Sequence, residues 1–67
     1  MAVTYSIVVW RMGYKLFATQ PQRILEAKEA YTLLTAKFSQ VDCYKIKSYQ
    51  HAEVPGVVEI DLTKVEI

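Results

Sequence analysis

The segment from Val3 to Thr19 reads VTYSIVVWRMGYKLFAT, and this pattern predicts a β-hairpin. β-Branched and aromatic residues, which are typical of strands, fill both halves of the segment. Met12 and Gly13 separate the two halves, and glycine supplies the positive φ that tight hairpin turns require. We therefore expect two antiparallel strands joined by a two-residue turn.

This turn also predicts the register of the hairpin. It pairs Arg11 with Tyr14, and an uninterrupted ladder then pairs Val9 with Leu16. One face of the hairpin would carry Tyr5, Ile7, Val9, Leu16 and Ala18, and the other Ser6, Val8, Trp10, Lys15, Phe17 and Thr19. The first face is expected to face the core, because it is the more apolar one. A slip of the register by one residue would exchange the two faces of one strand relative to the other.

Residues 21–38 show the periodicity of an amphipathic helix. Thr19 is the candidate N-cap, and Pro21 suits the first turn, where its missing N–H costs nothing. A single stripe at helical spacing is formed by Ile24, Ala27, Tyr31, Leu34 and Phe38. Leu25 and Leu33 lie off this stripe, on the outer side, and form a candidate second patch.

Residues 41–50 and 57–63 indicate a second hairpin around Pro55-Gly56, a dipeptide typical of type II turns. A minimal turn there would set Ile60 opposite His51 and spoil the apolar face. We therefore expect a wider loop, from about Gln50 to Gly56, or a bulge. Either would restore a face made from Tyr44, Ile46, Val58, Ile60 and Leu62, with the last strand ending near Thr63.

The order hairpin, helix, hairpin predicts a single α+β domain over residues 1–67, with the order ββαββ. A four-stranded, mainly antiparallel sheet with the helix packed on one face is the economical arrangement. If the first and last strands are neighbours in the centre, they run parallel, and the fold is β-grasp-like. A four-stranded meander is the alternative.

The composition and net charge of the chain disfavour several classes of function. The chain has 52% hydrophobic and 22% charged residues and a net charge of +1, which gives no general attraction to nucleic acid or acidic membranes. A single cysteine excludes an internal disulfide framework and any multi-cysteine zinc site. We expect no cofactor, no metal, no membrane span and no signal peptide, and a reducing, cytoplasmic setting.

Four residues carry groups that could do chemistry. His51 could act as a general acid or base, but no second histidine or nucleophile pattern accompanies it, so we expect a solvated loop residue. Cys43 lies eight residues from His51 and is expected to be a small, half-buried strand residue. Glu59 and Asp61 share a strand face, and pairing with Lys45 and Lys47 on the next strand is the expected role. We therefore predict that the protein is not an enzyme.

The sheet face away from the helix is the most informative surface in the sequence. Aromatic residues and lysines alternate there, a pattern that suits either a protein interface or the stacking of unpaired bases. Shielding by a terminal segment is the alternative without function. We predict that the partner-binding residues are Val8, Trp10, Lys15, Phe17, Leu25 and Leu33.

Two groups of proteins resemble the chain in architecture. Its hairpin (Val3–Thr19), helix (Pro21–Phe38) and hairpin (Val41–Leu62) look like the β-grasp modules of bacterial immunoglobulin-binding proteins. The short turn at Gly13 and the helix Gln22–Phe38 also resemble very small phage-encoded proteins that redirect host machinery. These resemblances imply a non-enzymatic protein-binding module, plausible as a phage-type inhibitor or adaptor in the host cytoplasm. Single-stranded nucleic-acid binding by the open face, and a structural or self-associating subunit, are the alternatives.

Overall fold

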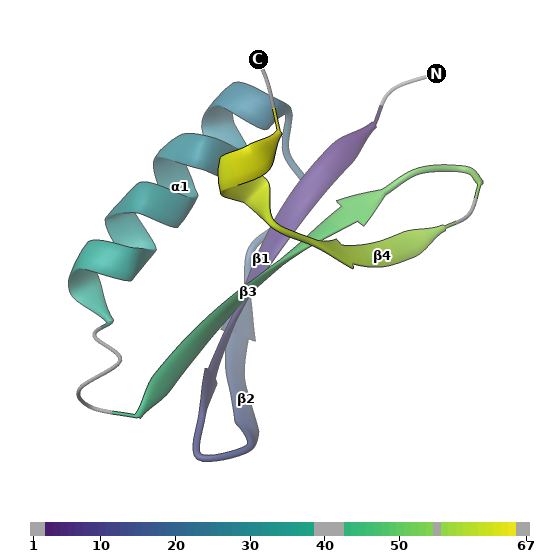
Figure 1. Ribbon diagram of the computed structural model, residues 1–67. Coiled ribbons are helices and arrows are strands. Elements are labelled where there is room, and N and C mark those ends of the chain that lie inside the picture. Colours follow the sequence, from purple (N-terminus) through teal and green to yellow (C-terminus); the bar gives the residue numbers. More distant parts are fainter. Residues whose placement is uncertain (1–2, 39–42, 55, 66–67) are drawn as a thin grey trace.

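The computed structural model describes residues 3–38, 43–54 and 56–65. The elements follow one another as β1 (Thr4–Arg11), β2 (Tyr14–Ala18), α1 (Ile24–Lys37), β3 (Tyr44–His51), β4 (Val57–Ile60) and the short 3-10 helix η2 (Leu62–Lys64). The four strands form one open sheet, and α1 lies across one side of it (Figure 1). This confirms the α+β class and the order ββαββ.

The strand order is β2-β1-β3-β4, and every pairing is antiparallel. The first and last strands are therefore not neighbours, so the parallel central pair of a β-grasp arrangement is absent from the described sheet. A meander is also excluded, because β1 separates β2 from β3. Length explains this order: β3 matches all eight residues of the apolar strand β1, whereas β4 has only four residues.

The β1–β2 turn has the predicted geometry. Met12 and Gly13 both have positive φ, 52° and 86°, which is the pattern of a type I′ turn. Arg11 pairs with Tyr14 as expected, but further along the strand Val9 pairs with Phe17. A bulge at Leu16 causes this shift, since it adds one residue to β2.

The bulge overturns part of the predicted core face. Leu16 is 49% exposed and Ala18 is also exposed, so neither belongs to the core. The β1 residues of that face are correctly predicted, because Ile7 and Val9 are fully buried. The core cluster consists of Tyr5, Ile7, Ala27 and Leu62, surrounded by partly buried Ile24, Ala30, Tyr31, Leu34, Ile46, Ile60 and Val65.

The helix begins later than the periodicity predicts. Thr19 does not cap it: the Thr19 N–H donates to the Ile7 carbonyl at 2.8 Å, and its hydroxyl accepts from the Ile7 N–H at 3.0 Å. Gln22 and Tyr5 then exchange two backbone hydrogen bonds of 2.7 and 2.8 Å. Because the chain keeps pairing with β1 up to this point, α1 starts only after Arg23, which provides no side-chain cap.

The second hairpin has a longer loop than a minimal turn. His51 pairs with Val57 and is still part of β3, so the loop begins later than expected. The resulting register sets Ser48 opposite Ile60, and Ile60 packs against the core as the wider loop predicted. Pro55, on which the predicted type II turn depends, lies outside the described residues, as do residues 41 and 42.

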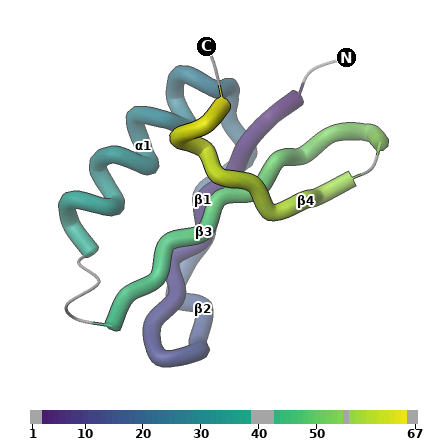
Figure 2. The backbone as a smooth tube through the Cα atoms, viewed as in Figure 1, coloured from purple at the N-terminus to yellow at the C-terminus, as the bar shows by residue number. Residues whose placement is uncertain are grey.

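The chain leaves the sheet at Ile60, earlier than expected. The buried Ser48 hydroxyl donates to the Ile60 carbonyl at 2.8 Å and accepts from the Leu62 N–H at 3.2 Å. This contact holds the turn that inserts the fully buried Leu62 between the sheet and α1. Figure 2 shows this C-terminal segment returning toward the helix.

Candidate interaction surface

The open face of the sheet is organised in rows that cross the strands. Directly paired residues of antiparallel strands point to the same side, and Trp10 pairs with Lys15 on β2 and with Lys45 on β3. Trp10 therefore lies at the centre of a row between two lysines. Val8 pairs with Lys47 in the next row. We call the four residues Trp10, Lys15, Lys45 and Lys47 the Trp10 face.

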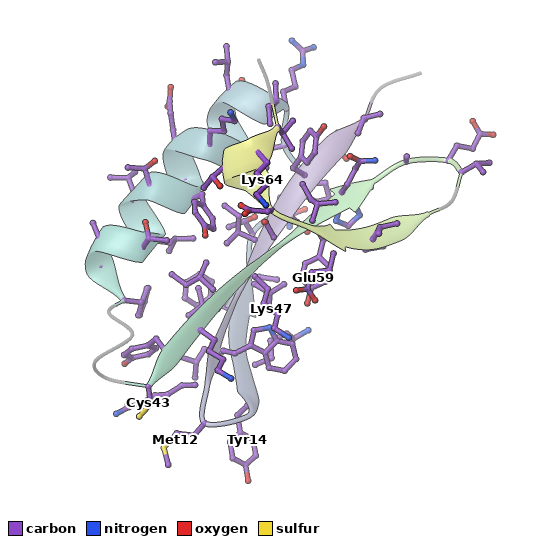
Figure 3. All side chains as sticks on the ribbon, viewed as in Figure 1. Met12, Tyr14, Cys43, Lys47, Glu59 and Lys64 are labelled. Carbon is purple, nitrogen blue, oxygen red and sulfur yellow. The ribbon has the colours of Figure 1, made fainter. Side chains whose placement is uncertain are left out.

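The Trp10 face is positively charged. The Lys47 ammonium lies 5.9 Å from the centroid of the Trp10 ring, a cation–π contact, and 3.9 Å from the Glu59 carboxylate. Figure 3 shows Lys47 and Glu59 close together on this side of the sheet. Both side chains are largely exposed, so the ion pair contributes about 1 kcal/mol at most.

Asp61 does not add a second carboxylate to this face. The sequence placed it beside Glu59 on a strand, but Asp61 follows β4 and its Oδ1 accepts from the Thr63 hydroxyl at 2.6 Å and the Thr63 N–H at 3.0 Å. The hydroxyl bond, followed by the backbone bond, holds the pKa of Asp61 below its ordinary value. Three lysines therefore face one glutamate, rather than the balanced pairing expected.

A groove opens beside the tryptophan. It is open to solvent, has a volume of about 940 Å³ and is lined by Trp10, Met12, Gly13, Cys43, Tyr44, Lys45, Ile46 and Lys47. The Trp10 side chain is half-buried, and its Nε1 is buried without a hydrogen-bond partner among the described residues. A buried N–H group without a hydrogen-bond acceptor is uncommon in folded proteins, so the environment of the Trp10 Nε1 needs an explanation.

The end of the first hairpin exposes large apolar side chains. Met12, Tyr14 and Leu16 are 75%, 77% and 49% exposed, and we call these three residues the hairpin tip. Figure 3 shows Met12 and Tyr14 projecting from the end of the hairpin, away from the rest of the sheet. The tip adjoins the groove, because Met12 also lines it.

Phe17 is not part of the surface that the sequence predicted. The bulge turns it to the same side as Val9, where its ring centroid lies 5.7 Å from that of Phe38. Phe38 in turn lies 4.9 Å from Tyr44, and the three rings form an aromatic cluster on the helix side of the sheet. The expected patch of Trp10 with Phe17 is therefore wrong.

Three other predicted partner-binding residues differ in how exposed they are. Val8 does lie on the open face but is only 9% exposed, so it offers little contact area. Leu25 and Leu33, 52% and 71% exposed, project from α1, which covers the opposite side of the sheet. They form a surface separate from the Trp10 face.

The groups that could do chemistry are not brought together. His51 is not a solvated loop residue, because it ends β3 and its Nε2 shares a hydrogen bond of 2.6 Å with the Ser6 hydroxyl. Within the described residues no carboxylate bonds to His51, and Ser6 is only 6% exposed, so the pair ties β1 to β3. Cys43 lies beyond the other end of β3 and is exposed rather than half-buried.

The described parts of the chain also contain no group of three or more metal-ligating side chains, and no helix of theirs is long and apolar enough to span a membrane. Comparison with known proteins adds nothing: no family model, curated protein or solved structure matches the chain.

Proposed function

We propose that this chain is a non-catalytic protein-binding module that acts by occupying a surface of a larger partner, as an inhibitor or adaptor does. The exposure of Met12, Tyr14 and Leu16 beside a groove supports this proposal most directly. Large apolar side chains exposed near a groove often mark interaction sites, and tyrosine and methionine are enriched at the centres of protein interfaces.

The gain from the hairpin tip can be compared with the cost of association. Full burial of one fully exposed large apolar side chain contributes roughly 1.5–3 kcal/mol, so three contribute about 4.5–9 kcal/mol at most, since Leu16 is already half-buried. Association costs on the order of 4–15 kcal/mol in lost translation and rotation. The tip alone therefore gives weak binding at best, and a specific complex needs further contacts, for which the groove lined by Met12 and Trp10 is available.

Self-association through strand edges is the competing proposal, because β2 is an edge strand and all five of its residues are exposed. Two features of β2 oppose it. Lys15 places a charge on this edge, and the bulge at Leu16 interrupts its regular course. Both are devices by which proteins prevent edge-to-edge pairing. We therefore favour contact through side chains over strand addition.

The test compares matched surface variants in affinity capture from the source cells, followed by mass spectrometry. Tyr14→Ser with Leu16→Ser removes two of the three apolar side chains of the hairpin tip, and Leu25→Ser with Leu33→Ser removes a similarly exposed apolar pair from α1. We expect only the first double variant to lose the captured partner, with both variants folded by circular dichroism. Loss with the helix variant alone would assign the interface to α1. Equal capture by all three proteins would refute an apolar interface at the tip.

A further inference from the structure

We propose that the Trp10 face receives an extended, acidic segment of the partner protein, with carboxylates beside Lys15 and Lys45 and an apolar side chain on the indole of Trp10. This inference rests on the proposed function and names the chemistry of the partner.

The spacing of the row suits such a segment. Neighbouring strands lie about 4.8 Å apart, so the backbones at Lys15 and Lys45 are separated by roughly 10 Å, with Trp10 between them. In an extended peptide the side chains at positions one, three and five point to one side and span about 13 Å. Long, flexible lysine side chains bridge this difference. A peptide that crosses the strands with the pattern acidic, apolar, acidic on one side therefore matches the pattern lysine, tryptophan, lysine.

Charge selects an acidic ligand. Neither Lys15 nor Lys45 forms an ion pair with any described residue, and the Lys47 pair with Glu59 is long and exposed. The two strand rows that contain Trp10 and Val8 thus carry three lysines, and Glu59 is the one carboxylate paired with them. This local excess of positive charge attracts carboxylates and repels a basic segment. The unpartnered Trp10 Nε1 adds a donor at the wall of the groove, and a carbonyl or carboxylate that displaces the side chains over it would accept from it.

A protein segment fits this surface better than single-stranded nucleic acid. Sequence-tolerant binding of unpaired strands uses several aromatic side chains on which successive bases stack. Trp10 is the only aromatic residue in the two lysine rows, and Tyr49, two rows away, pairs with Glu59, whose charge repels phosphates. The net charge of the chain, +1, is also small for a phosphate-binding protein.

The fluorescence of Trp10 reports on this site directly, because it is the only tryptophan in the chain. The probes are a peptide of about twelve residues that repeats Glu-Ser-Leu-Ser, its counterpart with Gln in place of Glu, and a single-stranded oligothymidylate of similar length. Each is titrated at about 50 mM and about 500 mM salt, because screening shortens the range of charge interactions between these concentrations.

We expect the acidic peptide alone to shift the emission, with binding that weakens strongly at high salt. Lys15→Gln and Lys45→Gln should each weaken it by up to about fivefold, while Lys28→Gln, which removes the same charge from α1, should have no effect. The inference is overturned if the acidic peptide does not bind at low salt, if the two lysine variants bind like Lys28→Gln, or if the oligothymidylate binds more tightly than the peptide.

The lysine variants also separate this inference from the proposed function. If the affinity capture described above depends on the hairpin tip but is indifferent to Lys15→Gln and Lys45→Gln, the chain is a protein-binding module and the acidic segment is refuted. If no variant affects capture, the proposed function is refuted as well. Loss of capture with the lysine variants, together with binding of the acidic peptide, supports both.

Discussion

Replacing Leu62 with alanine should destabilise the protein more than its position near the end of the sequence suggests. Leu62 is fully buried in the core cluster with Tyr5, Ile7 and Ala27. The substitution removes three carbon groups, worth about 0.8 kcal/mol each, and leaves a cavity, so the expected cost is about 3–5 kcal/mol. At 0.05–0.15 kcal/mol per residue, a chain of 67 residues has a total stability of roughly 3–10 kcal/mol. The variant should therefore lose roughly 30% of its stability or more.

Urea denaturation followed by Trp10 fluorescence and by circular dichroism measures this loss. The midpoint should fall while the m-value stays unchanged, because the same surface becomes exposed on unfolding. Leu33→Ala is the control: Leu33 is 71% exposed, so its truncation should change the free energy of unfolding by no more than about 0.5 kcal/mol. A cost below about 1 kcal/mol for Leu62→Ala, or an equal cost for both variants, would refute the placement of Leu62 in the core.

Three further predictions concern turns and the bulge. Met12→Asn should raise the free energy of unfolding by about 0.5–1 kcal/mol, because asparagine tolerates the φ of 52° better than methionine, and urea denaturation checks this. The lowered pKa of Asp61 means that its bonds to Thr63 stabilise the fold fully above the unfolded pKa of about 3.9 and are lost as pH falls through the folded value; the Thr63 amide signal in NMR should shift over that range in the parent and not in Asp61→Asn. Deleting Leu16 should remove the bulge and keep Phe17 in its present pairing, so cross-strand NMR contacts from Phe17 to the first strand should persist, and their loss would contradict the register.

Local signals in the sequence predicted the elements well. The two-residue turn at Met12-Gly13 and its first pair, Arg11 with Tyr14, follow from residues adjacent in the chain, and the structure has both. The helical stripe is also correct: Ala27 is fully buried and Leu34 packs against the core. In each case the preference of a short segment agrees with what the rest of the fold requires.

Long-range pairing was the part that local patterns could not predict. Nothing in the periodicity indicates that β3 rather than β4 lies beside β1, because this depends on the relative lengths of strands far apart in sequence. Local patterns also mispredicted the role of Thr19. Its hydroxyl would suit a helix N-cap, but it accepts a hydrogen bond from the Ile7 N–H instead. Competition between two partners for one polar group is decided only when the tertiary structure brings both within reach.

The bulge at Leu16, which the sequence analysis also did not predict, shapes the proposed site. Before it, Trp10 and Lys15 pair as an ordinary hairpin and face away from α1; after it, Phe17 turns toward the helix side and joins Phe38. An uninterrupted strand would have placed Trp10 and Phe17 on one face and made an apolar patch there. With the extra residue, Phe17 instead packs in the aromatic cluster on the helix side, and Trp10 stays on the open face between lysines. A single inserted residue thus changes the surface around Trp10 from an apolar one to a positively charged one. For this reason the proposed ligand of the Trp10 face is an acidic segment and not a second apolar face.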